Sequence, residues 1–362
     1  MKNKITCAVH LRLKDRSSTK NLIQYINEGL KPLGVNLMIL EDNQGYKFRC
    51  FPELSSGTFG RNDAKKVAEA AKAADIRIVP LFMCLGHQGW RYEKSNLLKA
   101  FPEFCETPEV EEGEKKPDTI AGKVINNTPD GNFYCHSWCA SNDDVYKYVF
   151  PMMDEIAEDF GADAVHVGMD EVFSIAEDSC PRCVGKSRYE LYARTVNILH
   201  DHIVKKKGMQ MMMWADRLQK ASDFGYDDWE GDALGIWRAV DMIPKDIILM
   251  PWHYGLNEKG FPGIEVFLEK GFSVLPACWR HLPNARLLWA EALKYSKSAK
   301  EKGYPGKLLG MTTTCWADAT SKYLEKLLMC LKEKVQDEDE MDYIGVASSL
   351  IYMTKALKEY RL

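Results

Sequence analysis

Two kinds of hydrophobic pattern alternate along the chain. Runs that are apolar almost throughout, such as IRIVPLFM at 76–83, predict strands, and eight of them occur. Apolar interiors without polar alternation are typical of parallel strands that are covered on both faces. The eight predicted strands are 5–13, 36–42, 76–83, 163–171, 209–216, 246–255, 271–280 and 308–318.

Segments with apolar residues at helical spacing lie between these strands. In 143–161, for example, Val145, Val149 and Met152 recur on one helical face. The other predicted helices are 21–34, 62–75, 188–208, 263–271, 284–303, 321–334 and 344–360. This alternation predicts an α/β fold, a single (β/α)8 TIM barrel over residues 1–362 with extended loops at its C-terminal face.

A doubly wound open sheet is the alternative arrangement of alternating strands and helices. Such sheets usually contain fewer strands and a glycine-rich loop after the first one, whereas HLRLKDRSS at 10–18 contains no glycine. In a barrel, the longest segment without periodicity, 84–142, would join the third strand to its helix and cover the C-terminal face. Loops of this length in compact domains tend to be functional, so we expect it to contribute to a site.

The composition excludes some classes of function. With 46% hydrophobic and 28% charged residues and a net charge of −4, the 362-residue chain lacks the basic surplus of nucleic-acid-binding proteins. No segment has the length of a membrane span, and the opening MKNKITCAVHL does not resemble a signal peptide. Eleven scattered cysteines suit a reducing compartment. We therefore expect a cytoplasmic protein that binds neither nucleic acid nor membrane, unless a leader has been removed.

Residues with useful chemistry fall at the C-terminal ends of the predicted strands, where TIM barrels place their active sites. Four of the nine tryptophans end four consecutive strands. Four core indoles at equivalent positions would crowd a barrel interior, which favours a pocket wall instead. An aromatic pocket that contains carboxylates suits a sugar ring. The residues expected in this pocket are Asp42, His87, Trp214, Trp252, Tyr254, Trp279, Trp316 and Asp318.

A pair of adjacent acids, Asp170 and Glu171, ends the fourth predicted strand in VHVGMDEVF. Alone, such a pair is more often a helix cap or part of a salt bridge, but here it follows His166 and Gly168 at the level of the tryptophans. Adjacent residues of a regular strand point to opposite faces. If both acids reach one cavity, the chain must leave strand geometry around Met169 to Glu171. The adjacency does not fit the usual glycosidase arrangement, in which two carboxylates on separate elements flank the bond.

The motif VHVGMDEVF resembles the H-x-G-G-D-E signature of family 20 glycoside hydrolases, the β-N-acetylhexosaminidases. NLMILEDNQGY resembles the second-strand segment of that family, and IRIVPLFMCLGHQ resembles its P-E-x-x-x-P-G-H segment. MMMWADRL, LMPWHYG and TTCWAD resemble the ends of its fifth, sixth and eighth strands, in the same order. The non-glycine before the acids and the opening VHLRLK look most similar to the hexosaminidase D-like branch.

The resemblance implies removal of terminal β-linked N-acetylhexosamine (GlcNAc or GalNAc) by a retaining, substrate-assisted mechanism without a cofactor. Carried over by position, Glu171 is the general acid/base, and Asp170 holds the 2-acetamido group, whose carbonyl oxygen attacks the anomeric carbon. His87 and Asp42 would support Glu171, and His166 would brace the strand end. A carboxylate beside another carboxylate in a partly apolar pocket has a raised pKa, as an acid catalyst requires. The pocket walls implied by the resemblance are Trp214, Trp252 and Trp316, with Asp318 binding sugar hydroxyls.

Two features of the family have no clear match in this sequence. For the arginine at the end of the first strand, which binds sugar hydroxyls, the candidates are Arg12, Lys14 and Arg16. The acetamido-binding tyrosine after the seventh strand is replaced by the region of CWRHL, and Tyr254 and Trp279 are candidates for its role. The smaller N-terminal α/β domain common in the family is absent, so we expect a bare catalytic barrel.

Two other functions stay open. A metal-dependent barrel hydrolase could use His87, His166 and Asp170, although the chain lacks a compact H-x-H or H-E-x-x-H ligand set. A non-catalytic sugar-binding barrel would use the same tryptophans, because a fold does not establish an activity. For the pocket itself we expect no metal ion.

Two cysteine pairs form a separate candidate site. Cys135 and Cys139 in YCHSWC, and Cys180 and Cys183 in SCPRC, lie in the loops after the neighbouring third and fourth strands. They could meet above the barrel and hold a structural zinc ion, although C-x3-C is a less usual spacing than C-x2-C. Free thiols are the other interpretation, and the sequence leaves both open.

Overall fold

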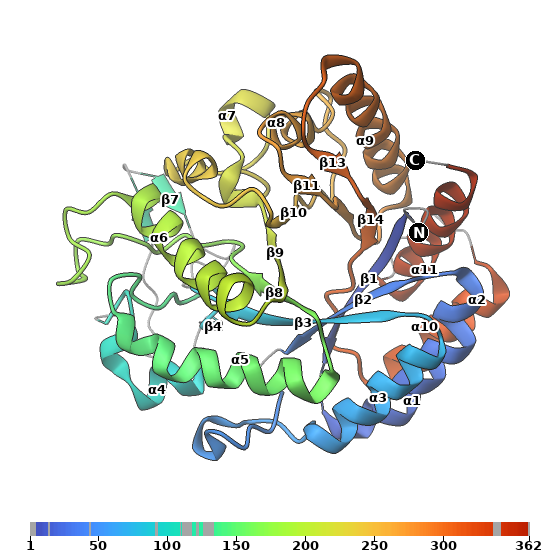
Figure 1. Ribbon diagram of the computed structural model, residues 1–362, viewed down its shortest axis with the longest axis horizontal. Coiled ribbons are helices and arrows are strands. Elements are labelled where there is room, and N and C mark those ends of the chain that lie inside the picture. Colours follow the sequence, from blue (N-terminus) through green and yellow to red (C-terminus); the bar gives the residue numbers. More distant parts are fainter. Residues whose placement is uncertain are drawn as a thin grey trace.

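The strands form a closed parallel ring with helices outside it (Figure 1). The computed structural model describes residues 5–13, 15–42, 45–90, 93–108, 110, 118–120, 123–125, 134–335 and 342–360, with the backbone alone at 42, 90, 118–120 and 123–125. Six strands follow one another around the ring in chain order, and each neighbouring pair is parallel. They are β1 (Thr6–Leu13), β2 (Leu37–Asp42), β3 (Arg77–Cys84), β8 (Ala164–Gly168), β9 (Gln210–Trp214) and β10 (Ile248–Met250).

Two interrupted strands close the ring. β11 pairs with β13, β12 pairs with β14, and β14 returns to β1, where Thr6 lies opposite Gly310. All eight predicted strands are therefore present, and the expected (β/α)8 TIM barrel is confirmed. The seventh and eighth strands consist of β11 (Ser273–Val274) with β12 (Ala277–Cys278), and of β13 (Lys307–Leu308) with β14 (Gly310–Thr313).

Helices follow the strands and cover the outside of the ring (Figure 1). A π-helical turn at Ile26–Leu30 joins the first two of them. The helices around the ring are α1 (Thr19–Tyr25), α2 (Lys31–Leu33), α3 (Arg61–Ala73), α5 (Tyr146–Phe160), α6 (Arg188–His200), α7 (Ala221–Phe224), α8 (Gly263–Glu269), α9 (Leu282–Lys302), α10 (Ser321–Glu333) and α11 (Asp342–Glu359). The long loop between β3 and α5 contains α4 (Asn96–Ala100) and the short strands β4 (Gly89–Trp90), β5 (Glu93–Lys94), β6 (Asp118–Ile120) and β7 (Lys123–Ile125).

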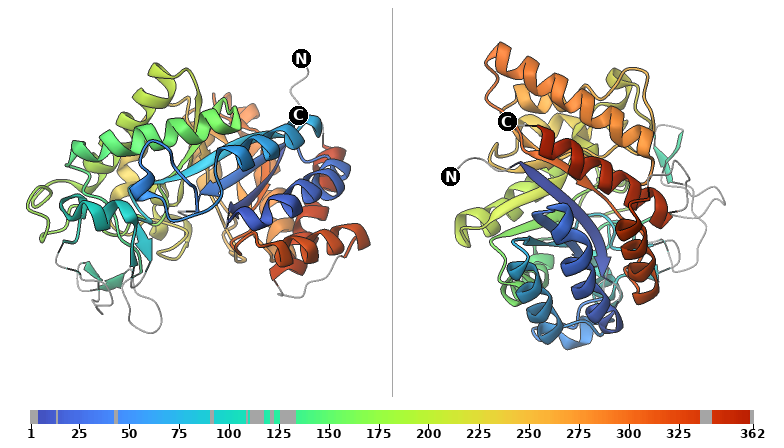
Figure 2. Two further views of the ribbon diagram at one scale, coloured as in Figure 1. Left: turned by 90° about the horizontal axis from the view of Figure 1, so that it is seen from below. Right: turned by 90° about the vertical axis from the view of Figure 1, so that its right-hand side faces the viewer.

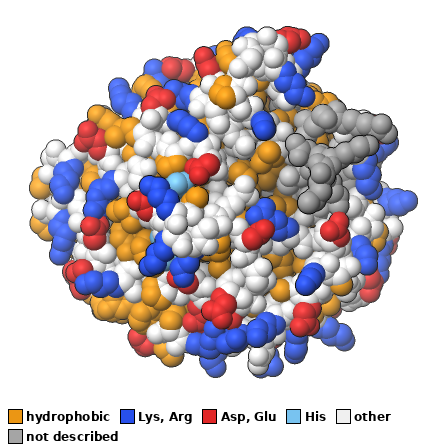
Figure 3. Space-filling view, viewed as in Figure 1, with side chains coloured by type: hydrophobic (Ala, Val, Ile, Leu, Met, Phe, Trp, Pro, Cys, Tyr) orange, Lys and Arg blue, Asp and Glu red, His pale blue; other side chains and the backbone are white. Residues whose placement is uncertain are grey.

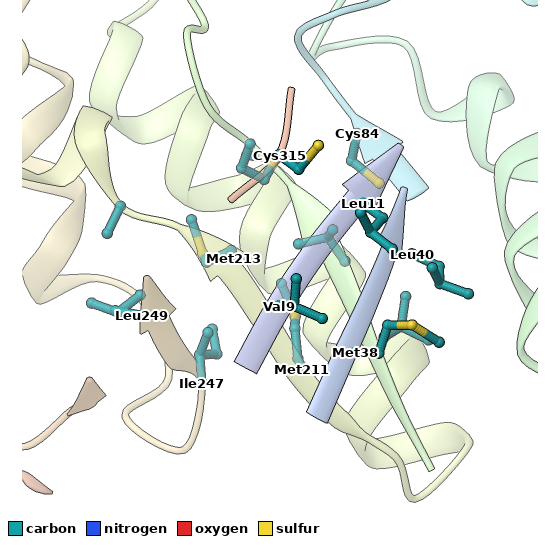
Figure 4. Close-up of a cluster of buried hydrophobic side chains, with 14 of the residues drawn as sticks. Val9, Leu11, Met38, Leu40, Cys84, Met211, Met213, Ile247, Leu249 and Cys315 are labelled. Carbon is teal, nitrogen blue, oxygen red and sulfur yellow. The ribbon is translucent and has the colours of Figure 1, made fainter. Parts of the chain in front are cut away.

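Side chains of each strand alternate between two buried layers, and this explains why the strands are apolar throughout. Val9 and Leu11 of β1 belong to the layer between the sheet and the helices, together with Met38 and Leu40 of β2 (Figure 4). Ala8 belongs to the second layer, which fills the barrel interior. Other members of the interior layer are Leu37, Ile39, Val79, Leu81, Met212, Trp214 and Met250.

Several strands end earlier than predicted, which changes the height of side chains above the barrel. β8 ends at Gly168, before the acid pair, and β10 ends at Met250 instead of at residue 255. In the ladder between β9 and β10, Trp214 lies opposite Met250. Trp252 therefore lies two residues further toward the C-terminal face than Trp214, and the predicted tryptophans do not share one level.

The outer surface is formed by helices and by charged side chains. α11 lies alongside β1, so the last described helix covers the first strand (Figure 2). Lys and Arg side chains are interspersed with Asp and Glu over the face in Figure 3, as is usual for a solvated surface. Within the described ranges, every helix is too short or too polar to cross a membrane.

Candidate active site

A cavity of about 410 Å³ opens at the C-terminal ends of the strands, where TIM barrels bind their ligands. Seven residues predicted for the site line it: His87, Asp170, Glu171, Trp252, Tyr254, Trp279 and Trp316. The other lining residues are Arg12, Glu41, Met83, Tyr134, Asp227, Trp229 and Glu230.

The chain turns sharply where the acid pair follows β8. Met169 and Glu171 have positive φ angles of 74° and 49°, which residues with a side chain rarely adopt. Gly168 before them also has a positive φ, and a Cβ atom there would lie 2.6 Å from the sulfur of Met83. The expectation that the chain leaves strand geometry between Met169 and Glu171 is therefore confirmed.

The two acid side chains meet at one imidazole ring. Nε2 of His87 lies 3.2 Å from Oδ2 of Asp170 and 3.3 Å from Oε2 of Glu171. His87 itself, three residues after β3 ends, has a φ of 55°. Gly86 permits the close approach of the two strand ends, because a Cβ atom there would lie 2.9 Å from the carbonyl oxygen of Asp170. Backbone strain of this kind concentrates at functional sites.

Burial and neighbouring charges set the protonation of this cluster. Desolvation raises the pKa of Asp170 to about 6, against the lowering effect of His87, while Asp216 and Glu171 add to the rise. Burial lowers the pKa of His87, but Asp170, Cys135 and Glu171 outweigh it and raise that pKa well above the usual range. Asp170 and His87 are in contact, so the protonation of each depends on that of the other. This raised carboxyl pKa belongs to Asp170, the expected partner of the acetamido group, whereas the sequence reasoning expected it for the acid catalyst.

Glu171 is held through both its side chain and its backbone. The hydroxyl of Tyr134 donates a 2.6 Å hydrogen bond to Oε2 of Glu171, and the amide of Glu171 donates to Oδ2 of Asp216 at 2.9 Å. The fully buried Arg217 donates to the same Asp216 oxygen at 2.8 Å and to the carbonyl oxygen of Trp229 at 2.7 Å. One buried ion pair thus positions both an acid and an aromatic residue of the cavity.

Aromatic rings form a large part of the cavity wall. Trp252 and Tyr254 stack with their centroids 4.9 Å apart, and Trp279 meets Tyr254 edge-on at 5.6 Å. Nε1 of Trp316 donates a 2.9 Å hydrogen bond to the hydroxyl of Tyr254. These contacts fix the rings before any ligand binds, which suits stacking on the C–H face of a sugar.

Charged residues of the first two strands form a polar corner of the cavity. Arg12 lies opposite Glu41 in the β1–β2 ladder, with its Nε 3.6 Å from Oε1 of Glu41. Oε2 of Glu41 lies 2.9 Å from Nε2 of His10. Of the candidates for the family's arginine, Arg12 therefore lines the cavity. Arg16 is two-thirds exposed at the surface, and Lys14 lies outside the described residues.

The prediction that Trp214 forms a wall of the pocket is wrong. Its side chain is fully buried in the barrel interior, where its ring lies 4.6 Å from that of His166 and 5.9 Å from that of Trp316. The reason is its height: Trp214 is the last residue of β9 and lies level with Met250, below Trp252. It supports the residues of the pocket from beneath.

Two further predicted residues lie at the edge of the site or below it, and the side chain of a third is not described. Asp318 lies beside the cavity with Oδ1 3.7 Å from Nη2 of Arg12, and its role in binding sugar hydroxyls stays a prediction. His166 is fully buried, and its Nδ1 accepts a 3.1 Å hydrogen bond from the amide of Gly168 at the end of β8. Asp42 is the last residue of β2, and its side chain lies outside the described part of the structure.

Sequence reasoning missed six lining residues. Glu41 and Met83 belong to β2 and β3, and the other four come from loops: Tyr134, Asp227, Trp229 and Glu230. The length of the segment 84–142 pointed to a function there, but no periodicity singled out Tyr134. The other three follow β9 in the irregular segment DDWEGD. Glu230 also orders the next strand end, because Oε1 accepts a 2.8 Å hydrogen bond from the amide of Tyr254.

The acid–histidine cluster could also hold a cation. One ligand atom each from His87, Asp170 and Glu171 lies within 4.8 Å of the others. His166, which the metal-dependent alternative required, is not part of this group. A second group with ligand spacing forms away from the cavity, and it contains three of the four predicted cysteines.

A closed barrel with paired acids and aromatic rings at its C-terminal face has the architecture of a glycoside hydrolase catalytic domain. The chain matches the family model described as glycosyl hydrolase family 20, catalytic domain, over residues 35–328. It therefore belongs to glycoside hydrolase family 20.

Two curated proteins resemble the chain over most of its length. A beta-hexosaminidase of Porphyromonas gingivalis is 23% identical over 294 residues, which cover 74% of this chain and 35% of that protein. Beta-hexosaminidase 1 of Coccidioides posadasii is 23% identical over 284 residues, which cover 71% of this chain and 40% of that protein. The matched part of the chain thus spans 35–40% of the length of these relatives.

Solved structures share the fold. The chitobiase of Flavobacterium johnsoniae has a TM-score of 0.62 at 19% identity, covering 96% of this chain and 52% of that one. A beta-N-acetylhexosaminidase from Bacteroides fragilis has a TM-score of 0.59 at 15% identity, covering 96% and 66%. An exo beta-N-acetylglucosaminidase from Vibrio harveyi, solved with N-acetylglucosamine, has a TM-score of 0.60 at 14% identity, covering 97% and 55%.

Proposed function

We propose that this chain removes terminal β-linked N-acetylhexosamine from glycans by a retaining, substrate-assisted mechanism. The observation that carries the proposal is the convergence of Asp170 and Glu171 on His87 inside an aromatic cavity. Membership of glycoside hydrolase family 20 and the similarity to two beta-hexosaminidases support the same assignment.

Glu171 is the proposed general acid and base. Its side chain is 13% exposed, so a ligand in the cavity can reach the carboxyl group. It gives its proton to the glycosidic oxygen as the bond to the aglycone breaks, and it later takes a proton from the attacking water. The hydrogen bond from Tyr134 holds Oε2 of Glu171. Because the carboxyl group is planar, this bond also restricts where Oε1 can point.

Asp170 is the proposed partner of the 2-acetamido group. As a carboxylate it accepts the acetamido N–H and orients the carbonyl oxygen toward the anomeric carbon. A bond forms between these two atoms while the aglycone leaves, and positive charge develops on the new ring. A fixed negative charge at Asp170 stabilises that transition state. Water then opens the ring from the original side, which retains the configuration.

Other lining residues have proposed roles in binding. Trp252 and Trp316 present ring faces to the sugar, while Arg12 and Glu41 are suited to its hydroxyl groups. Tyr254 is the stronger candidate for the acetamido carbonyl. Because an indole N–H can only donate, the Tyr254 hydroxyl accepts the bond from Trp316, and it can donate its own hydrogen to a ligand in place of the longer 3.4 Å contact with Oγ1 of Thr314.

The test uses matched aryl β-glycosides that differ only at C2. A 2-acetamido substrate should be hydrolysed with release of the β-anomer, and its 2-hydroxyl counterpart should react slower by orders of magnitude because it lacks the internal nucleophile. Comparable turnover of both would contradict the mechanism. Binding of N-acetylhexosamine without hydrolysis would instead establish a sugar-binding barrel. A C4-epimer pair would show whether GlcNAc or GalNAc is preferred.

A metal-dependent hydrolase is the second candidate, because His87, Asp170 and Glu171 have ligand spacing. An ion held there would be lost from an Asp170→Asn variant, and turnover would not require a 2-acetamido group. Metal analysis of this variant beside the wild type separates the two candidates. An unchanged metal content with lost activity supports the substrate-assisted mechanism.

We also propose a cytoplasmic location. None of the eleven cysteines, all of which the structure describes, forms a disulfide, and this suits a reducing compartment. Recovery of the protein mainly from the medium or the periplasm of its native cells would contradict this proposal.

A further inference from the structure

Four side chains with ligand chemistry converge above the barrel and outside the cavity. Glu106 and Cys139 belong to the long loop after β3, while Cys180 and Cys183 belong to the loop between β8 and α6. All four are buried, and one ligand atom from each lies within 4.8 Å of the others. Sγ of Cys139 lies 3.4 Å from Sγ of Cys183 and 3.5 Å from Sγ of Cys180.

We propose that Glu106, Cys139, Cys180 and Cys183 hold one structural zinc ion. Three thiolates and a carboxylate make a closed tetrahedral ligand set. With zinc–sulfur bonds of about 2.3 Å, tetrahedral geometry places the sulfurs about 3.8 Å apart, near the separations found here. Cys180 and Cys183 form the usual C-x2-C turn, in which the amide of Cys183 donates to the carbonyl oxygen of Cys180 at 3.0 Å.

The buried glutamate is the independent sign of a missing positive charge. Glu106 is fully buried, and its Oε1 accepts a 2.9 Å hydrogen bond from the amide of Glu177. Its Oε2 has no hydrogen-bond partner within the described residues, and the thiols of Cys180 and Cys183 lie beside the carboxyl group. Burial of a carboxylate is costly unless it is paired or coordinates a metal. A zinc ion would satisfy this oxygen and the three sulfurs together.

Cys135, which the sequence suggested as a ligand, does not join the cluster. Residues 135–139 run between 85–89 and 104–106, with backbone hydrogen bonds to both segments. In an extended chain, four residues cover about 13 Å, so Cys135 and Cys139 cannot share one ion. Sγ of Cys135 lies instead 3.6 Å from the carbonyl oxygen of Glu171, and Glu106 takes its place in the ligand set.

The proposed ion would tie together the two loops that carry the acid–histidine cluster. The loop of Glu106 and Cys139 also contains His87 and Tyr134, and the loop of Cys180 and Cys183 begins at the acid pair. Zinc would therefore act as a structural clamp that supports the cavity without touching a ligand. The site does not depend on the proposed function, since it would also order a sugar-binding barrel.

The experiment is elemental analysis of the full chain, purified without metal-affinity resin or added zinc. About one equivalent of zinc per chain is expected. Less than about a tenth of an equivalent overturns the proposal. Two oxidised thiols among Cys139, Cys180 and Cys183, detected by mass spectrometry after alkylation, also overturn it.

Variants identify the ligands. Cys183→Ser should lower the zinc content severalfold and lower the unfolding temperature, and Glu106→Gln should weaken retention of zinc against a chelator. Cys135→Ser is the matched control, because it removes a buried thiol from the same loop and should keep the full zinc content. Equal loss in Cys135→Ser and Cys183→Ser overturns the ligand set. If Cys183→Ser does not fold, the wild type is treated with a thiol-modifying reagent, which should release the zinc if the thiols hold it. Asp170→Asn should retain its zinc, because Asp170 lies outside the ligand set.

Discussion

Tyr134→Phe is the sharpest test of how the cavity positions its proposed general acid, Glu171. The substitution removes the hydroxyl group that donates the 2.6 Å hydrogen bond to Oε2 of Glu171. Burial and the neighbouring Glu171 raise the pKa of Tyr134 well above its usual range, so the hydroxyl is a donor at every working pH. The aromatic ring keeps its contacts with Trp229 and Phe173 at 4.8 and 6.1 Å, so the fold should survive.

The expected size of the effect follows from the strength of that bond. A hydrogen bond to a charged group contributes about 1.5–3 kcal/mol. If the Tyr134 bond directs the proton of Glu171 in the transition state, its loss should lower kcat/KM by about 10–150-fold. The loss should appear mainly in kcat, because the bond acts on the reacting carboxyl group and not on the bound sugar.

Steady-state kinetics with an aryl N-acetylhexosaminide measure the effect, and thermal unfolding provides the control for stability. The substitution should lower kcat/KM more for a substrate with a poor leaving group than for one with an activated leaving group, since the poor leaving group needs more proton transfer. Tyr134→Phe with kcat/KM within about twofold of the wild type would refute the reasoning, because the bond would then contribute under about 0.5 kcal/mol. A change confined to KM would also refute it and would make Tyr134 a binding residue.

Three further predictions concern the same cavity. Glu171→Gln should cost about 10²–10⁴-fold with poor leaving groups and less with activated ones, whereas Asp170→Asn should be severe with both; a nearly silent Asp170→Asn, measured by kcat, would demote Asp170 to a structural role. Trp214→Ala should destabilise the protein by about 3–5 kcal/mol in denaturant titrations, as replacement of a fully buried tryptophan by alanine does. Trp316→Ala should mainly weaken sugar binding measured by calorimetry, and equal losses of stability in the two variants would place both tryptophans in the core. Because the pKa of Asp170 is raised to about 6, its carboxylate becomes protonated as the pH falls through that value, so kcat/KM should decline there. If kcat/KM of the wild type stays constant as the pH falls through 6, this assignment is contradicted.

The barrel could be predicted because its strands carry the signal along their whole length. Each strand is buried on both faces, so Val9 and Ala8 are both apolar although they point to different layers. That pattern distinguishes a parallel ring from an exposed sheet. It does not set where a strand ends, because apolar residues continue into the loops, as they do past Met250 in β10.

Strand register explains the error at Trp214. In the sequence, each tryptophan follows a run of apolar residues, so all appear to reach the same height. The ladder places Trp214 opposite Met250, and Trp252 lies one inward-facing position higher. Register depends on hydrogen bonds between segments that are far apart in the sequence, and a single sequence carries little trace of it.

Loop residues were the hardest to predict, for a related reason. Glu106 and Tyr134 contact partners in another loop, and neither lies in a periodic segment. Cysteine spacing suggested Cys135 as a ligand, but spacing is informative only when the chain between the ligands turns back, as it does from Cys180 to Cys183. The assignment to the hexosaminidase D-like branch likewise stays a prediction.

The strained turn after β8 explains why two adjacent acids end one strand. In a regular strand, one of Asp170 and Glu171 would point away from His87. Left-handed residues such as Met169 cost about 1–3 kcal/mol each, and that strain persists only where surrounding contacts fix it. The hydroxyl of Tyr192 donates to the carbonyl oxygen of Met169 at 2.9 Å, and the amide of Glu171 donates to Asp216. Each such bond contributes about 0.5–1.5 kcal/mol, so several are needed to hold the turn. The departure from strand geometry that made this segment hard to interpret is thus the feature that brings both carboxyl groups into one cavity.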